Sequence, residues 1–284
     1  MNRPTELAAA LRALEACDPK PAEILVSDDS PASDRRSEDV CRQFRAVKYQ
    51  VGLRSGLSAN RNACVAASAG KWLHFTDDDL IVPADFYSRA AKVLAIRGDR
   101  SVVSGCEWKY EHGPDAPPAL MQPQHSGFWA HMRNAEKQDA NCVVINAAVF
   151  PRELFRTARF DERLKYGCEE SDITLQAIHA GYKLVYEPSL FVKHYPSTAN
   201  RDQYRGWLIA SQVYAGLKRQ WLYRGGALGA VAFGAFAVPR LLLFQLRRSG
   251  LSAFIASTMQ ACRGIAYFLP LLHARNSRLG HESA

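Results

Sequence analysis

Two short apolar segments that each end abruptly in aspartates constrain the fold more than any other feature of this sequence. Residues 22–27 lead into Asp28 and Asp29, and residues 71–76 lead into the aspartates at 77–79. Each segment is rich in β-forming residues and bounded by turn-forming ones, which predicts a buried strand. A helical pattern separates them, so we expect right-handed crossovers and a mainly parallel sheet. In such sheets ligands bind at the carboxyl ends of the strands, where both acidic clusters fall.

The whole pattern predicts an α/β catalytic domain over residues 1–200, with a Rossmann-like sheet flanked by helices, and a helical region over residues 201–284. Apolar residues at helical spacing predict helices over residues 5–17 and 59–69. A loop followed by a helix with an acidic start is expected over residues 160–181. Further extended segments are expected at residues 47–51, 101–108, 142–150, 183–186 and 190–194.

The second region is apolar and basic. Residues 225–246 are interrupted by Arg240, and residues 251–272 carry Arg263 in their middle. A membrane-spanning helix needs about 20 predominantly apolar residues, so a span here would bury an arginine. A peripheral contact through residues 225–272, lying in the membrane interface, is therefore the easier state. Helices packed on the catalytic domain or on each other are the alternative.

The net charge of +8 suits nucleic acid, anionic lipid or a diphosphate equally well. Much of the excess follows Arg201, with Lys218 and Arg219 among it, and alternates with apolar stretches, which favours a membrane surface. The sequence has no aromatic-basic motif, so we expect no nucleic-acid partner. Seven cysteines without C-x-x-C spacing and an N-terminus unlike a secretory signal indicate a cytoplasmic protein, at the inner face of the cell membrane.

The aspartate triplet at the second strand end suggests a metal. Mg²⁺ and Mn²⁺ prefer oxygen ligands, and closely spaced carboxylates at a strand end supply them. Asp77 and Asp79 fit this role, while Asp78 either shares it or points elsewhere. Taken alone, such a triplet is also typical of a solvated turn.

Five segments match one family in order and spacing over residues 1–195. They are ILVSDDS, GLSANRNACVAASAGKWLHFTDDD, NAAVFPRELF, RFDERLKYGCEESDITLQAIHAGYKLVYEP and residues 192–194. An ordered set is far more specific than any single piece. Together they resemble the family 2 glycosyltransferases, whose catalytic domain has the GT-A fold. The resemblance implies inverting, metal-dependent transfer of a sugar from a nucleotide-sugar donor to an acceptor hydroxyl on a cell-surface polysaccharide or lipid-linked glycan.

The resemblance also assigns residues to the donor. Asp28 and Asp29 match the strand-end acids that contact the nucleoside base and ribose, although a turn cap is their simpler role. Arg61 is a candidate for the diphosphate, with an exposed helical arginine as the alternative. Asp78 is placed on the donor side of the aspartate triplet.

On the metal side, Asp77 and Asp79 match the Asp-X-Asp element that holds Mg²⁺ or Mn²⁺, and His194 matches a histidine that often completes that site. A divalent cation there stabilises the negative charge that grows on the departing diphosphate. For His194, a structural role after a strand is the alternative.

The acceptor side is assigned to Glu169, Glu170 and Trp108. Glu170 matches the general base, which accepts the proton of the attacking hydroxyl, although the family most often has aspartate there. The loops from Trp108 onward are expected to set the specificity for donor and acceptor. Asp172, at the start of the same helix, is expected to cap it.

The family's first strand is the main departure. Members begin with a hydrophobic strand ending in a Thr-Tyr-Asn-Arg-like turn, of which only Asn2, Arg3 and Pro4 match here. Either the start site is set too late or the domain lacks this strand and leaves a sheet edge open. The alternative function is therefore a catalytically impaired remnant that binds a nucleotide sugar or a partner protein. A nucleotidyltransferase is disfavoured because no Gly-rich, Lys-bearing loop precedes the acids.

Overall fold

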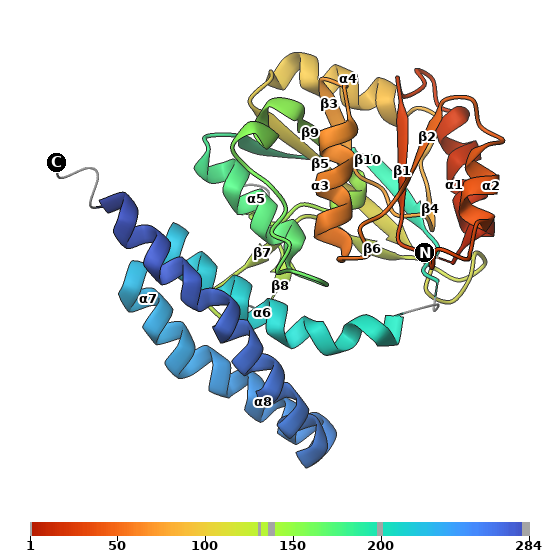
Figure 1. Cartoon of the computed structure of the whole chain (residues 1–284). Helices are drawn as coiled ribbons and strands as arrows, with labels where there is room; N and C mark the ends of the chain where they lie inside the picture. The colour runs from red at the N-terminus through yellow and green to blue at the C-terminus, as the bar shows by residue number, and fades with distance from the viewer. Residues whose placement is uncertain (1, 130–131, 136–139, 198–200, 280–284) are drawn as a thin grey trace.

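The first predicted strand forms as β1 (Ile24–Asp28), which pairs in parallel with β2 (Val47–Val51). Three helices accompany this pair, namely α1 (Pro4–Glu15), α2 (Arg36–Cys41) and α3 (Leu57–Ala67). The computed structural model describes residues 2–129, 132–135, 140–197 and 201–279. Figure 1 shows this N-terminal part beside a larger sheet, with a helical hairpin projecting away from both.

The larger sheet has six strands in the order β3–β9–β5–β10–β4, with β6 paired to β5 outside this path. The strands are β3 (Trp72–His74), β4 (Leu80–Ile81), β5 (Ser101–Lys109), β6 (Ala119–Met121), β9 (Ala148–Pro151) and β10 (Lys183–His194). β5 and β10 run parallel, whereas the other pairings of this sheet are antiparallel. The predicted α/β class is confirmed, but the strand directions are mixed rather than mainly parallel.

Side chains that alternate along the strands pack into two cores on opposite faces of the large sheet. Val103 and Val149 join the core under α1 and α4 (Phe86–Arg97). Their neighbours Val102 and Ala148 join the second core, under α5 (Glu169–His179). The remaining short elements are β7 (Gln124–Ser126), β8 (Met132–Asn134) and the 3₁₀ turns η1 (Ile145–Ala147) and η2 (Arg152–Arg156). The single strand expected at residues 142–150 is therefore split by η1.

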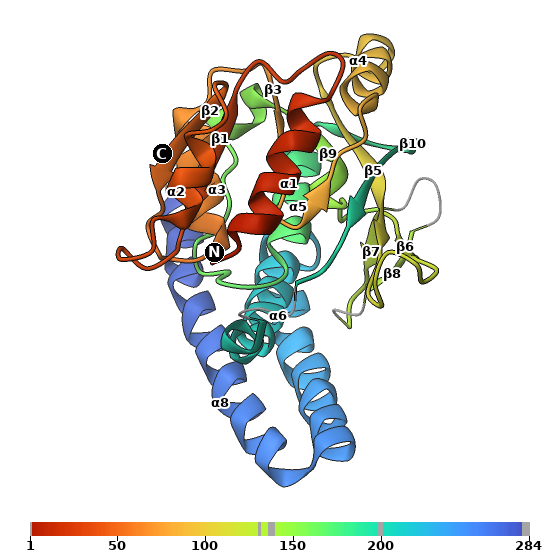
Figure 2. The same cartoon turned by 90° about the vertical axis from the view of Figure 1, so that its right-hand side faces the viewer.

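The helical region is built on α6 (Arg201–Tyr223). It is followed by α7 (Gly226–Ala232), a π-helical turn η3 (Phe233–Ala237) and α8 (Val238–Leu279). α8 breaks at Gly250, whose φ of 82° suits glycine, so the residues from Gly226 to Leu279 form two antiparallel arms. We call these arms the C-terminal hairpin, and Figure 2 shows them reaching away from the sheets.

The hairpin packs on α6 through a third core. Gly216 lies so close to Phe233 that an added Cβ would fall 2.1 Å from its ring, and Gly264 similarly lies against the Ala210 carbonyl. One helical stretch among the described residues, Gly226–Leu272, is long and apolar enough to cross a membrane by length and composition alone. Only 22% of its most apolar window is buried, so packing covers one side of it.

Candidate functional site

The two acidic clusters open onto the same cavity of about 890 Å³. Because β1 and β3 both end at this point, the aspartates that follow them meet at one edge of the fold. Residues predicted for the site that line the cavity are Asp28, Asp29, Arg61, Asp77, Asp78, Asp79 and His194. Glu169, Glu170 and Trp108 do not line it. The donor and metal candidates are thus brought together, and the acceptor candidates lie outside this cavity.

Asp28 and Asp29 differ in what they do locally. Asp28 is buried, and its carboxylate accepts hydrogen bonds from the Ser30 amide and hydroxyl and from the Tyr49 hydroxyl. Asp29 is partly exposed and accepts a hydrogen bond of 2.7 Å from the Arg54 amide. Asp28 therefore fixes the turn after β1, and Asp29 is the better candidate for contact with a ligand.

Arg3 holds two members of the aspartate triplet. Its guanidinium lies 2.7 Å from Asp78 Oδ1 and 2.6 Å from Asp79 Oδ2. Burial alone would raise the pKa of Asp79, but hydrogen bonds from His194 and the Ser197 amide and the charge of Arg3 lower it to about 2. Asp79 is thus ionised, and the arginine supplies positive charge at the place where a cation would be bound.

His194 lies between two carboxylates. Its Nδ1 is 2.5 Å from Glu107 Oε1, and its Nε2 is 3.3 Å from Asp79 Oδ1. Burial lowers the pKa of His194, but hydrogen bonds to Asp79 and Glu107 outweigh this and raise the pKa to about 9. The imidazole is therefore a cation at neutral pH, and it must lose a proton before it can bind a metal.

Glu107 is a site residue that the sequence reasoning missed. It is 4% exposed on β5, where it binds His194 and accepts a hydrogen bond of 3.2 Å from Asn146 Nδ2. The same amide nitrogen lies 3.5 Å from Asp77 Oδ2. The available signal was a carboxylate inside an otherwise apolar strand, because a buried charge needs a specific partner. Trp108, the neighbour chosen from the sequence, does not line the cavity.

Arg61 links the triplet to α5. Its guanidinium pairs with Glu169 Oε1 at 3.3 Å and with Asp77 Oδ1 at 3.6 Å, and it lies over the Phe160 ring. The side chain is 7% exposed. The alternative of an exposed helical arginine is therefore wrong, and Arg61 holds acids from two elements in place.

Glu170 is the second residue of α5, next to Glu169. Desolvation of its carboxylate and the charge of Glu169 raise the pKa of Glu170 to about 8, against the opposing charge of Arg61. The carboxyl group is thus mainly protonated at pH 7, and it can accept a proton only after losing its own.

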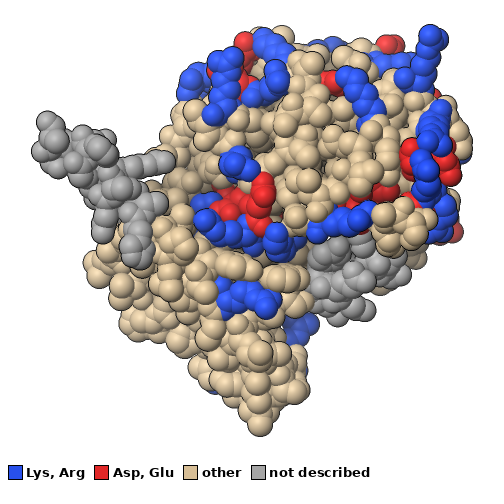
Figure 3. All heavy atoms as spheres, viewed as in Figure 1, with Lys and Arg blue, Asp and Glu red and all other residues tan. Residues whose placement is uncertain are grey.

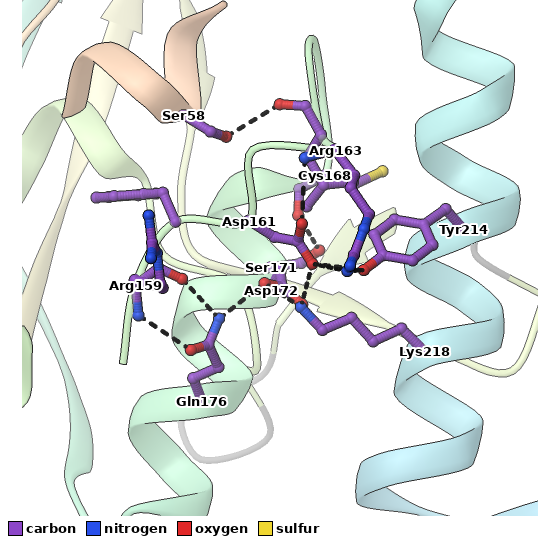
Figure 4. A network of polar contacts seen from close by, with 12 residues as sticks. Ser58, Arg159, Asp161, Arg163, Cys168, Ser171, Asp172, Gln176, Tyr214 and Lys218 are labelled. Carbon is purple, nitrogen blue, oxygen red and sulfur yellow. Dashed lines mark hydrogen bonds and ion pairs between the residues drawn. The ribbon is translucent and has the colours of Figure 1, made fainter. Parts of the chain in front are cut away.

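A second polar network fixes α5 from the other side (Figure 4). Lys218 of α6 pairs with Asp161 at 2.7 Å and with Asp172 at 2.8 Å. Tyr214 donates a hydrogen bond of 2.5 Å to Asp161 and accepts one from Arg163. α5 has no side-chain cap, so the expectation that Asp172 caps it is wrong. Its carboxylate instead ties α5 to α6.

The donor set of Asp77, Asp79 and His194 fits Mg²⁺ or Mn²⁺ in chemistry. Two buried acceptors close to it, Asn146 Oδ1 and Glu169 Oε2, have no hydrogen-bond partner, which an added cation or its water would supply. Among the residues that the structure describes, no three His, Cys, Asp or Glu side chains are already arranged as a metal site. The ligands fit, but their present partners hold them in other contacts.

Comparison with known proteins identifies the family. Residues 1–159, more than half of the chain, match the model of glycosyl transferase family 2. The succinoglycan biosynthesis protein ExoM of Rhizobium meliloti strain 1021 is 27% identical over 263 residues, which cover 85% of this chain and 82% of ExoM.

Two solved structures share the fold. The S. aureus TarS 1–349 structure in complex with UDP-GlcNAc has a TM-score of 0.59 at 13% identity, over 92% of this chain and 76% of that one. The GalNAc-T7 structure with UDP, GalNAc and Mn²⁺ has a TM-score of 0.57 at 15% identity. That match covers 72% of this chain, which spans only 43% of the GalNAc-T7 chain. From the family match and the shared GT-A fold, we conclude that the chain belongs to glycosyl transferase family 2 and is a glycosyltransferase.

Proposed function

We propose that this glycosyltransferase moves a sugar, with inversion and with Mg²⁺ or Mn²⁺, from a nucleoside diphosphate sugar to a hydroxyl of a cell-surface polysaccharide or lipid-linked glycan. The observation that carries the proposal is the opening of the acids after β1 and β3 onto one cavity. The similarity to ExoM, a succinoglycan biosynthesis protein, supports a polysaccharide acceptor. The UDP-GlcNAc bound to TarS and the UDP and Mn²⁺ bound to GalNAc-T7 support the class of donor and metal.

The donor end of the proposed site rests on Asp29 and the aspartate triplet. Asp29, which is partly exposed at the cavity, is suited to accept hydrogen bonds from a ribose or base. Bound by Asp77, Asp79 and His194, a divalent ion would supply positive charge to the diphosphate leaving group. Arg61 then acts as a positioning residue, because it already pairs with Asp77 and Glu169.

The acceptor end of the proposed site rests on Glu170. In an inverting displacement the acceptor hydroxyl attacks the anomeric carbon as the bond to the diphosphate breaks, and its proton passes to a carboxylate. Glu170 would receive that proton at one of its Oε atoms. The pKa of about 8 sets the fraction of enzyme that is ready to do so.

The direct test is a transfer assay with the purified chain, UDP-sugars and an added divalent metal. Asp79→Asn should reduce metal-dependent turnover at least a hundredfold, because it removes charge from the proposed metal site. The matched control is Asp39→Asn, an exposed aspartate on α2 that pairs with Arg42, which should leave turnover unchanged. Equal turnover by the Asp79 and Asp39 variants would refute the metal assignment.

The second candidate is a nucleotide-binding remnant without turnover. The Arg3 contacts to Asp78 and Asp79 favour it, since a side chain already neutralises the proposed metal ligands. Isothermal calorimetry with UDP separates the two functions. Binding of UDP without transfer from any tested sugar donor, with either metal, would select the remnant.

We further propose that the C-terminal hairpin lies on a membrane surface. Its second arm exposes an apolar stripe at helical spacing, made of Leu251, Ile255, Met259 and Leu269. The space-filling view shows the projecting end of the hairpin as mostly uncharged on the face in view (Figure 3). These features support a peripheral contact, and a location at the inner face of the cell membrane stays a prediction.

The two mid-arm arginines, which opposed a membrane-spanning helix in the sequence, have partners in the fold. Arg240 lies over the Trp129 ring at 5.2 Å, and Arg263 lies over the Trp207 ring at 4.5 Å. Both rings come from outside the hairpin, so the arginines are drawn toward the rest of the molecule. The apolar stripe is thereby left free of their charge, which supports the flat orientation.

A further inference from the structure

The turn after β7, over residues 126–129, is held by one side chain from the helical region. Arg219 of α6 donates hydrogen bonds to the Ser126 hydroxyl and to the carbonyl oxygens of Ser126 and Gly127, the last at 2.6 Å. The Phe128 carbonyl lies 3.4 Å from its Nη2. A planar guanidinium carries five donors in a fixed fork, so it can bind several successive acceptors. We call residues 126–129 the β7 turn.

The burial of Arg219 is unfavourable by itself. The side chain is 5% exposed, and its Nε has no hydrogen-bond partner. Among the residues that the structure describes, no carboxylate forms an ion pair with it, and burial and the charge of Arg224 lower its pKa to about 10. A buried cation without an acid beside it costs stability, so its contacts with the β7 turn point to a role in position.

The β7 turn is connected to the first turn of α5 by hydrogen bonds. The Ser126 amide donates one of 2.8 Å to Asn141 Oδ1. Two residues further, the Val143 amide donates one of 3.2 Å to Thr174 Oγ1, whose hydroxyl donates one of 2.6 Å to the Glu170 carbonyl. The β7 turn does not line the cavity of the aspartates, so it belongs to the acceptor end of the proposed site.

Trp129 ends the β7 turn with its ring at the surface. Its exposed fraction is 49%, whereas Phe128 packs against the third core and the ring of Phe233. Phe128 meets Trp129 edge to face at 5.1 Å, and Arg240 lies over the indole at 5.2 Å. These contacts fix the orientation of the indole and leave about half of it open. Such a rigid aromatic ring offers a large contact area with little loss of conformational freedom on binding.

A sugar ring matches this open surface. The C–H groups of a pyranose carry slight positive charge, and the face of an indole is negative. Sugar hydroxyls beside the ring could accept hydrogen bonds from the guanidinium of Arg240. Lipid is a poorer match, because Trp129 belongs to the catalytic part and lies outside the apolar stripe of the hairpin.

We propose that Trp129 binds a sugar ring of the acceptor glycan by stacking, and that Arg219 is the positioning residue that holds the β7 turn for this contact. The inference rests on the proposed function, because it says where the acceptor lies relative to Glu170. Acceptor affinity then depends on α6, a helix that carries none of the proposed donor or metal residues.

The first experiment measures glycan binding by the full chain without turnover. The labelled protein, with UDP and Mn²⁺, is applied to an array of α- and β-linked gluco-, galacto- and manno-oligosaccharides. Trp129→Ala should reduce binding to the glycans that the native chain retains by about tenfold, and Trp129→Phe should restore most of it, because a smaller aromatic ring still stacks. The matched control is Phe244→Ala on α8, where the native ring is 51% exposed, and it should leave glycan binding unchanged.

Two array results overturn the proposal. One is a native chain that retains no glycan, and the other is equal glycan binding by Trp129→Ala and Phe244→Ala. Co-sedimentation with phosphatidylglycerol vesicles tests the lipid alternative, and Trp129→Ala should bind vesicles as the native chain does. Loss of vesicle binding with glycan binding intact would assign the ring to lipid and overturn the proposal as well.

The second experiment tests Arg219 by steady-state kinetics with a glycan that the array retains. Arg219→Met keeps the aliphatic bulk and removes the hydrogen bonds to the β7 turn, so it should raise the KM for the glycan about tenfold and leave hydrolysis of the donor by water unchanged. Equal losses in both reactions would overturn the positioning role. If Arg219→Met does not fold, Ser126→Ala replaces it, since that variant removes only the hydroxyl acceptor, and an unchanged KM there overturns the role.

Failure of the proposed function gives a different result. A chain that retains glycans but neither hydrolyses nor transfers any UDP-sugar keeps the Trp129 subsite and is not a transferase. In that case glycan binding by Arg219→Met on the same array decides the role of Arg219, with weaker binding supporting it and native binding overturning it.

Discussion

Arg61 and Glu169 are separated by 108 residues in the chain, yet they form an ion pair of 3.3 Å in the interior, with each side chain 7% exposed. The pair connects α3 to the start of α5, so it couples the proposed donor side of the site to the proposed acceptor side. The pair fixes the position of α3 relative to α5 and adds little net stability, because a buried ion pair is seldom more stabilising than apolar residues of similar size.

The variant Arg61→Met is expected to cost about 3–5 kcal/mol in the free energy of unfolding, because it leaves Glu169 buried without its partner. Adding Glu169→Leu to that variant should recover part of the loss. Urea denaturation of the single and double variants measures both effects. Strictly additive losses would show that the two side chains do not interact.

The pKa of Glu170 predicts the pH dependence of transfer. A general base must be deprotonated, and the pKa of this carboxyl is raised to about 8. The value of kcat/KM should therefore increase as the pH rises from about 6 to about 9, and Glu170→Gln should abolish transfer at every pH. A profile that is flat over this range would remove Glu170 from the role of base.

The raised pKa of Glu170 has the opposite effect on stability: activity is expected to rise with pH, whereas the contribution of this group to the free energy of unfolding falls. The pKa of a free glutamate is about 4.3, so the raised folded value means that the neutral form stabilises the fold at low pH. That contribution is complete below about pH 4 and is lost as the pH rises through about 8. Glu170→Gln, which stays neutral, should flatten the fall in unfolding free energy between pH 5 and 9. Parallel pH profiles for the two proteins would contradict this account.

Lys218 lies outside the cavity that the aspartates after β1 and β3 line, and its substitution is expected to lower the stability of the fold. Lys218→Met should lower the free energy of unfolding by about 3–5 kcal/mol, because it leaves Asp161 and Asp172 without their buried partner. The matched control is Lys71→Met, whose ion pair with Asp99 is exposed and should contribute about 0–1 kcal/mol. Chemical denaturation of both variants gives the comparison, and similar losses would mean that the Lys218 network is not special.

The exposed stripe predicts vesicle binding. Met259→Glu places a charge in the stripe, where the native side chain is 69% exposed, and should reduce co-sedimentation with phosphatidylglycerol vesicles severalfold. Ile96→Glu is the control, because Ile96 is 80% exposed but lies on α4, outside the hairpin. Equal binding by both variants would show that the hairpin does not meet the lipid.

The sequence predicts the elements that carry local signals. The strands before Asp28 and Asp77 and the helix of residues 57–67 are found because apolar period and turn residues are local features. The sequence does not predict that β9 runs antiparallel to its neighbours, because a short apolar segment can pair equally well in either direction. Glu107 lies 87 residues from His194, and only the fold brings the two together.

The basic residues after Arg201 show a second limit of prediction from sequence. Lys218 and Arg219 were counted among the basic residues that favour a membrane surface, but the fold buries them, at 7% and 5% exposure. Lys218 pairs with acids of the catalytic part, and Arg219 hydrogen-bonds to the Ser126 and Gly127 backbone. A composition count cannot separate a cation that faces lipid from one that anchors a helix, because it ignores the direction of each side chain.

The reversal at Gly250 has a topological consequence. The chain leaves the C-terminal hairpin on the side from which it entered, so in the proposed membrane contact the catalytic part and the last helical turns would stay on one side of the bilayer. A flat hairpin would also occupy area in one monolayer only and would push its lipids apart. An enzyme held in this way would concentrate where that monolayer is convex, and its attachment would report on the curvature of the surface beneath it.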